Sequence, residues 1–242
     1  MKSRPVCLFL FLITLSALSA ADSPDTWTNQ DGQTMTATVT AVEERIVVFE
    51  RDGQTFRYPI ANLVEEDQQR VRERAEQLAE QAKAEEAREK VARELRGNLV
   101  GVRGRRVANL PADTVEDKTL FALYYSAAWC GPCRNFTPRL VDFYGEMREK
   151  HPDFEIILVS RDSSPSNMEG YMRDFNIPWP AVRHNRINQM DLLKKYSGSG
   201  IPNLVFIDGG GEVLSSSYVN GRYRGPTAVM RDIRRHLETQ GR

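Results

Sequence analysis

The chain has 242 residues, of which 33 are Lys or Arg and 33 are Asp or Glu, so its formal net charge is zero. Such a balance argues against nucleic acid as a partner, because proteins that bind it usually carry a surplus of basic residues. The length is sufficient for one medium-sized domain with a small companion.

Residues 1–21 have the features of a secretory signal peptide. Two basic residues stand near the start, an apolar run covers 6–18, and small residues at 19–21 offer a cleavage site. The apolar run is short for a membrane span, so an uncleaved anchor is the less favoured alternative. We therefore expect an exported protein, secreted or periplasmic, with no stable membrane span once the leader and its Cys7 are removed.

The next segment, residues 22–64, predicts a small all-β module. Runs rich in Thr, Val and aromatic residues cover 33–39, 46–51 and 55–58, and such runs are typical of strands. Asp-Gly pairs lie beside these runs and mark the turns between them. We therefore expect a small antiparallel sheet.

This module resembles the Sla1 homology domain 1 family. The resemblance is carried by Trp27-Thr28, Asp31-Gly32, Val47-Val48-Phe49, Asp52-Gly53, Tyr58-Pro59-Ile60, Leu63 and Asp67. It implies a small SH3-like barrel and a role in protein interaction, so we expect the module to have a protein ligand. No ligand-binding residue of the family can be transferred to this sequence.

Residues 65–97 predict a long, charged helical spacer. The segment up to Arg96 is dense in Glu, Arg, Gln, Lys and Ala, and it contains neither Gly nor Pro. Several Glu residues precede Lys or Arg by four positions, which is the stabilising order on a helix. An apolar seam begins at Val71 but meets Glu85 within two heptads, so a solvated spacer is favoured over a dimerising coiled coil.

The remaining residues, 98–242, alternate strands and helices. Apolar runs over 119–125 and 154–160 predict two central strands, and a helix is expected from 134 to 150. A third strand at 203–207 leads through a Gly-rich turn into a hairpin partner. Further helices are expected at 166–175, where Ser166 is the expected N-cap, at 189–196 and at 226–237.

The motif Trp129-Cys130-Gly131-Pro132-Cys133 lies between the first central strand and the helix that follows it. Two cysteines at this spacing can close a small disulfide ring and reopen it by thiol exchange. The first sulfur is expected at the N-terminus of a helix, where the helix dipole and free backbone N–H groups favour the thiolate.

Other uses of this cysteine pair fit less well. A structural zinc site would need a second pair of ligands, and the three histidines, His151, His184 and His236, are scattered along the sequence. An inert disulfide across a two-residue gap would contribute little loop-closure stabilisation. We therefore expect redox chemistry at the pair, with no metal and no organic cofactor.

The segment from about 106 to 236 resembles the thioredoxin-like superfamily, in particular its tryparedoxin, nucleoredoxin and TlpA-like branch. The resemblance is carried by the residues from Ser126 to Arg134, Phe136-Thr137-Pro138, the run 154–160, Ile177-Pro178-Trp179 and Gly200-Ile201-Pro202-Asn203-Leu204. It implies an α/β fold with a central mixed sheet flanked by helices, preceded here by the β module and the charged helix.

The resemblance also implies roles for individual residues. Cys130 would be the sulfur that attacks a client disulfide, and Cys133 would resolve the mixed disulfide. Trp129 would shield one side of the pair, although core filling is an alternative for this side chain. The residues expected to contact substrate are Trp129, Gly131, Pro132 and the cis-proline loop formed by Ile201 and Pro202.

One departure from the family pattern concerns the proton of Cys133. Many relatives place a buried carboxylate either six residues before the first cysteine or three residues after the second. Those positions are Tyr124 and Phe136 in this sequence, so no proton acceptor is identified. Glu155 and water remain as candidates.

The sequence thus predicts an exported thiol–disulfide oxidoreductase that reduces disulfides in client proteins. It would draw electrons from an upstream thiol donor, and the bacterial periplasm is the favoured compartment. Two alternatives stay open at this point: a protein-binding scaffold or adaptor led by the β module, and a disulfide oxidase or isomerase.

Overall fold

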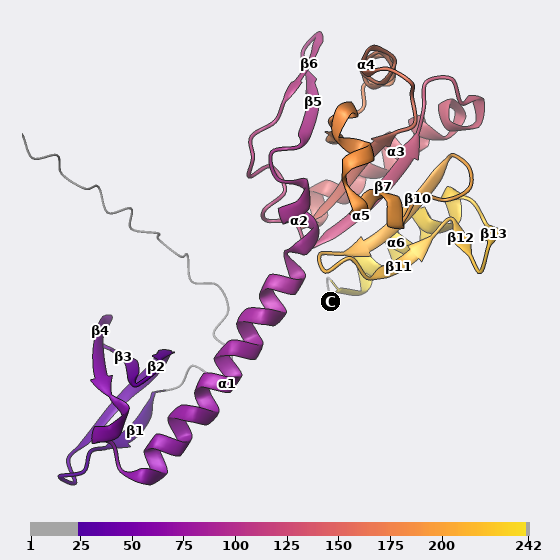
Figure 1. The fold of residues 1–242 in the computed structure, drawn as a ribbon. Helices are drawn as coiled ribbons and strands as arrows, with labels where there is room; N and C mark the ends of the chain where they lie inside the picture. The colour runs from indigo at the N-terminus through magenta and orange to yellow at the C-terminus, as the bar shows by residue number, and fades with distance from the viewer. Residues whose placement is uncertain (1–23, 241–242) are drawn as a thin grey trace, which may run out of the picture. The chain divides into compact units, whose positions relative to one another are not determined.

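The computed structural model describes residues 24–240 and divides into two compact units, with the boundary after Ala82 (Figure 1). The expected signal peptide over 1–21 lies outside the described residues. No helix between residues 24 and 240 is long and apolar enough to cross a membrane.

The first unit contains a four-stranded antiparallel sheet, as expected for an all-β module. Its strands are β1 (Asp25–Thr28), β2 (Thr34–Glu43), β3 (Ile46–Arg51) and β4 (Gln54–Pro59), in the order β1-β2-β3-β4, followed by the short 3₁₀ helix η1 (Ile60–Asn62). Asp52 and Gly53 both have positive φ and form the two-residue turn between β3 and β4.

The core of this unit is built around Trp27. Its indole N–H donates to the carbonyl oxygen of Ala37 at 2.9 Å, and its ring packs against Phe49 with 5.3 Å between centroids. The helix that follows the sheet contributes Val71 to the same core, and its buried Asp67 accepts a hydrogen bond from a backbone N–H of β1. The resemblance of this unit to the Sla1 homology domain 1 family stays a prediction.

The single helix expected over residues 65–96 is in fact two helices. Helix α1 runs over Glu65–Arg88 and helix α2 over Lys90–Leu95, with Glu89 between them. The N–H of Val91 donates to the carbonyl oxygen of Gly209 at 2.9 Å and not to the preceding helical turn. A side chain at position 209 would clash, because a Cβ atom there would lie 1.9 Å from the carbonyl oxygen of Arg88.

Helix α2 therefore packs into the second unit. Its apolar residues Val91, Ala92 and Leu95 are buried in the same core cluster as Phe121 and Leu123 of the central sheet. A segment that the sequence assigned to a solvated spacer thus contributes to a folded core.

The second unit is a seven-stranded mixed sheet flanked by helices, which confirms the expected fold class. The strand order is β11-β10-β7-β8-β9-β5-β6, and β7, β8 and β9 run parallel. The strands are β5 (Leu99–Arg103), β6 (Arg106–Asn109), β7 (Leu120–Ser126), β8 (Phe154–Ser160), β9 (Ala181–Val182), β10 (Asn203–Asp208) and β11 (Val213–Ser216), with a separate hairpin of β12 (Tyr218–Val219) and β13 (Arg222–Tyr223). The helices are α3 (Gly131–Lys150), α4 (Pro165–Asp174), η2 (His184–Gln189), α5 (Asp191–Lys195) and α6 (Pro226–Gln240).

Both faces of the sheet are covered, so strand β7 is buried at every position. Its alternate residues enter two different cores, because successive side chains of a strand point to opposite faces. Tyr124 lies in the core shared with α3 and α6, and Tyr125 lies in the core shared with α2 and α5. This explains why the sequence of β7 is continuously apolar and does not alternate with polar residues.

Two local features differ from expectation. The hairpin of β5 and β6, which extends one edge of the sheet, was not predicted. The N-cap of α4 is Ser164 and not Ser166: the Ser164 side chain accepts a hydrogen bond from the N–H of Asn167 at 3.2 Å, and Pro165 occupies the first turn. Proline suits that position because its missing N–H would have no partner in the first turn.

Candidate active site

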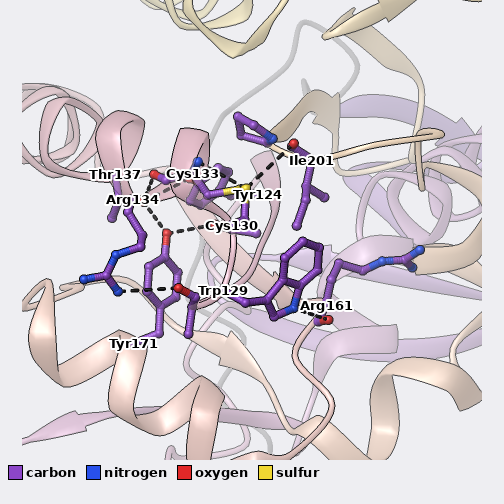
Figure 2. The surroundings of a disulfide bond; sticks show 12 residues. Tyr124, Trp129, Cys130, Cys133, Arg134, Thr137, Arg161, Tyr171 and Ile201 are labelled. Carbon is purple, nitrogen blue, oxygen red and sulfur yellow. Dashed lines mark hydrogen bonds between the residues drawn. A yellow bond between two sulfur atoms is a disulfide. The ribbon is translucent and has the colours of Figure 1, made fainter.

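The two cysteines lie where strand β7 passes into helix α3. Cys130 is the N-cap of the helix, and Cys133 lies in its first turn (Figure 2). The N–H of Cys133 donates to the sulfur of Cys130 at 3.2 Å. Pro132 stands at the helix start, where a residue without an N–H is tolerated.

The pair forms a disulfide, and its two sulfur-bearing residues differ in their surroundings. Cys133 is fully buried, whereas Cys130 retains 4% of its surface. The exposed residues Gly131 and Pro132 lie between them and form the outer part of the ring. An incoming sulfur can therefore reach the pair only from the side of Cys130.

The loop before β10 lies against this disulfide. The peptide bond between Ile201 and Pro202 is cis, as the resemblance implied, and the carbonyl oxygen of Ile201 is 3.8 Å from the sulfur of Cys130. Ile201 packs against the small cluster of Ala127 and the two cysteines. All the residues expected at the site, from Trp129 to Cys133 and in the cis-proline loop, thus lie together.

Trp129 is exposed and does not fill a core. Its side chain is 67% exposed, and its indole N–H donates to the carbonyl oxygen of Arg161 at 3.3 Å. The alternative that this tryptophan serves only as core filling is therefore wrong. Figure 2 shows the ring on the side of Cys130, the less buried of the two cysteines.

A network of four buried hydroxyl groups lies beneath the pair. The Thr137 hydroxyl donates to the carbonyl oxygen of Cys133 at 2.9 Å and is bonded to the hydroxyl of Tyr124 at 2.9 Å. Thr137 is also hydrogen-bonded to Tyr171, which in turn is bonded to Ser126 at 2.8 Å. Only the presence of polar residues in otherwise apolar runs could have pointed to this network from the sequence.

This network supplies hydrogen-bond donors and no base. Burial raises the pKa of Tyr124 far above its usual range, so its phenol stays protonated. Tyr124, which stands where many relatives have a carboxylate, therefore fixes the backbone around Cys133 through Thr137 and does not accept a proton.

Glu155, one of the two candidate proton acceptors, lies at the wrong end of the sheet. It pairs in register with Phe121, whereas Ser126 at the active-site end of β7 pairs with Ser160. Five residues of strand separate the two levels, which is roughly 16 Å. Glu155 instead accepts hydrogen bonds from the Tyr144 hydroxyl at 2.8 Å and from its neighbour's backbone N–H.

Replacing Glu155 with Gln is expected to stabilise the protein at neutral pH. Burial raises the pKa of Glu155 in the fold, so the ionised form is disfavoured there relative to the unfolded chain. Below the pKa that Glu155 has in the unfolded chain, its carboxyl is protonated in both states and the free energy of unfolding is at its full value. This free energy falls as pH rises through the higher pKa of Glu155 in the fold, because the unfolded chain ionises more readily. The thermal midpoint of Glu155→Gln should therefore exceed that of the parent by a few degrees at pH 8, and the difference should shrink at pH 4.

The matched control is Glu149→Gln, which removes the same charge from an exposed position at the end of α3. It should show no pH-dependent gain. An equal shift for Glu155→Gln at both pH values would contradict the assigned cause.

Comparisons with known proteins agree with this geometry. Residues 117–213 match the sequence profile of a family described as thioredoxin-like. A probable nucleoredoxin 1 of Arabidopsis thaliana is 42% identical over 98 residues, which cover 40% of this chain and 16% of that protein. A tryparedoxin of Trypanosoma brucei brucei is 40% identical over 95 residues, which cover 38% of this chain and 61% of that protein.

A nucleoredoxin of Xenopus laevis is 38% identical over 117 residues, covering 46% of this chain and 25% of that protein. The chain therefore spans a quarter or less of the length of these nucleoredoxins. Among solved structures, tryparedoxin I from Leishmania major is 32% identical with a TM-score of 0.41, and the match covers 50% of this chain and 81% of that one. Residues 117–213 are therefore thioredoxin-like in sequence, and the second unit is similar to nucleoredoxins and tryparedoxins.

Proposed function

We propose that this protein is an exported thiol–disulfide oxidoreductase that reduces disulfides in client proteins through Cys130 and Cys133. The observation that carries the proposal is the placement of the pair at the start of α3 and beside the cis-proline loop, with Cys130 as the reachable partner. The relationship to nucleoredoxins and tryparedoxins supports redox chemistry at this site.

In the first step, Cys130 acts as the nucleophile. Its thiolate is stabilised by the N–H of Cys133 and by the dipole of α3, and it attacks one sulfur of the client disulfide. A bond forms between Cys130 and that sulfur, the client disulfide breaks, and the second client sulfur leaves as a thiolate that takes up a proton. The exposed ring of Trp129 and the backbone of Ile201 border the position of the client.

In the second step, Cys133 resolves the mixed disulfide. Its thiol loses a proton and attacks the sulfur of Cys130, which restores the internal disulfide and releases the client sulfur that Cys130 had bound, as a thiolate that takes up a proton. Two electrons pass from the cysteine pair to the client in one cycle. The hydrogen bond from Thr137 to the carbonyl oxygen of Cys133 keeps this residue in place for the attack.

The cycle needs an upstream thiol donor to reduce the pair again, and it needs no metal or organic cofactor, because thiol exchange requires only the two sulfurs. The leader predicted over residues 1–21 supports export, and we favour the bacterial periplasm as the compartment. The N-terminal unit would bind a protein ligand of its own, consistent with its resemblance to an interaction module.

The variant Cys133→Ser is expected to accumulate mixed disulfides with client proteins. Without a resolving thiol, the covalent intermediate at Cys130 cannot collapse. Non-reducing gels of extracts that express the variant should show adducts that disappear on reduction. Adducts of the same pattern and amount with Cys130→Ser, and none with Cys133→Ser, would show that the two roles are reversed.

A further inference from the structure

The rim of the active site carries arginines that have no acidic partner. Arg134, Arg161 and Arg222 are all exposed, and across residues 24–240 none of the three lies within ion-pair distance of a carboxylate. Arg134 follows Cys133 directly and donates to the carbonyl oxygen of Ala128 at 3.4 Å. The rim therefore has positive charges that the protein itself does not neutralise.

Arg161 stands beside the exposed tryptophan of the site. Its backbone carbonyl accepts the hydrogen bond from Trp129, and its own N–H donates to the carbonyl oxygen of Ser126 at 2.8 Å. Figure 2 shows the Arg161 side chain starting beside the ring of Trp129, with its guanidinium extending away from that ring. These backbone contacts thus fix the position of Arg161 in the chain next to Trp129.

Arg222 lies on the hairpin of β12 and β13, which is attached to the cis-proline loop. The hydroxyl of Tyr223 donates to the carbonyl oxygen of Pro202 at 2.8 Å. The ring of Tyr218 covers Gly198, where a Cβ atom would lie 2.4 Å from that ring. The hairpin also exposes Val219 and Tyr223, at 47% and 50% of their surface.

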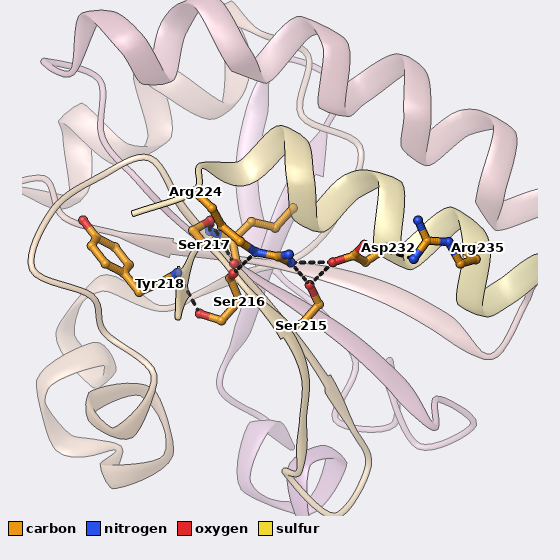
Figure 3. Close-up of polar contacts among 8 residues, drawn as sticks. Ser215, Ser216, Ser217, Tyr218, Arg224, Asp232 and Arg235 are labelled. Carbon is orange, nitrogen blue, oxygen red and sulfur yellow. Dashed lines mark hydrogen bonds and ion pairs between the residues drawn. The ribbon is translucent and has the colours of Figure 1, made fainter. Parts of the chain in front are cut away.

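Two nearby carboxylates form no ion pair with these three arginines. Asp162 is buried beneath the loop of the cysteine motif, where its oxygens accept hydrogen bonds from the N–H of Ala128 and the hydroxyl of Ser160. Asp232 is paired with Arg224, and Figure 3 shows this pair together with Ser215 on the hairpin side of α6. Arg224 is consequently occupied by an internal partner, whereas Arg222, two residues earlier, is not.

We propose that the physiological client presents its disulfide on an extended protein segment rich in Asp and Glu. This inference rests on the proposed function. A segment lying over Cys130 and Ile201 would meet Arg161 beside Trp129, and its apolar side chains would contact Trp129 and Tyr223. Arg222 stands on the opposite face of the hairpin from Tyr223 and would attract the segment through its longer-range field. Unpaired cations around a cleft attract a partner of opposite charge and raise its rate of association.

The test uses three synthetic peptide disulfides that are identical except for acidic, neutral or basic residues flanking the cystine. We expect the acidic peptide to have a kcat/KM about tenfold above that of the basic one at low salt. This ratio should fall towards one at high ionic strength, because salt screens exposed charges. Equal values for all three peptides, or a ratio insensitive to salt, would overturn the inference.

Variants then assign the effect to the rim. Arg161→Gln and Arg222→Gln should each lower the acidic-to-basic ratio by about two- to fivefold, as expected for an exposed charge interaction. The matched control is Lys150→Gln, which removes one positive charge at the far end of α3, about 30 Å from its start. If Lys150→Gln lowered the acidic-to-basic ratio of kcat/KM as much as the two arginine variants do, the inference would also be overturned.

The outcomes separate this inference from the proposed function. A protein that reduces none of the peptides, with Cys130 intact and reduced, would refute the proposed function itself. Reduction of all three with equal efficiency would leave the function standing and refute only the acidic client. A marked preference for glutathione disulfide over the acidic peptide would indicate a small-molecule substrate and likewise refute a protein segment as the client.

Discussion

Replacing Cys130 with Ser is expected to abolish disulfide reduction while the fold is retained. Serine is close in size to cysteine, but its hydroxyl is not ionised at neutral pH and cannot exchange with a disulfide. The loss of the nucleophile of a covalent mechanism should lower kcat/KM by at least about three orders of magnitude. The measurement is catalysed reduction of insulin by dithiothreitol, followed as the turbidity of the released chains.

The control for this variant is its stability. Removal of a disulfide that spans two residues costs little loop-closure entropy, so circular dichroism and the thermal midpoint should stay close to those of the parent with a reduced pair. If Cys130→Ser kept more than a small fraction of the parent activity, Cys130 would not be the attacking sulfur.

A chain that begins at Asn98 is expected to lose the fold of the second unit, whereas a chain that begins at Lys83 should keep it. Truncation at 98 removes Val91, Ala92 and Leu95, all of them buried against the sheet. Removal of a single large buried side chain costs about 2–5 kcal/mol, and domains are typically stable by about 5–15 kcal/mol. Urea unfolding of the two truncated chains, monitored by tryptophan fluorescence, measures the difference.

A point variant isolates the contribution of α2. Leu95→Ala in the full chain should lower the free energy of unfolding by about 2–5 kcal/mol, whereas the exposed Glu85→Ala in α1 should change it little. If the chain starting at Asn98 were as stable and as active as the one starting at Lys83, α2 would be dispensable. The interpretation of residues 65–97 as a mere spacer would then be restored.

Much of the second unit could be predicted because its signals are local. Strand β7 is an apolar run up to its last residue, β8 is apolar apart from Glu155 and its terminal serine, and α3 begins within the cysteine motif at Gly131. The break at Glu89 could not be predicted in this way, since no Gly or Pro marks it. It arises because Val91 donates its N–H to Gly209, a residue more than a hundred positions away in sequence.

In the active site, too, the features set by local sequence could be predicted, whereas those set by contacts between distant segments could not. The five residues of the cysteine motif and the cis-proline loop are recognisable as short motifs, and the structure brings them together. The hydroxyl network beneath them joins Ser126, Thr137 and Tyr171 from three different elements, so no local sequence pattern predicts it. Glu155, one of the two candidate proton acceptors, is ruled out for a related reason: the register of the strands, which sequence does not reveal, places it far from Cys133.

The reduction potential of the Cys130–Cys133 couple tests the central claim most directly. It is obtained by equilibrating the protein in thiol–disulfide buffers of known potential and counting free thiols by alkylation and mass spectrometry. A reductase of client disulfides should give a value near that of thioredoxin, about −270 mV. A value far below about −300 mV, as for structural disulfides, would contradict a role in exchange, and one near −120 mV would contradict the reductive direction.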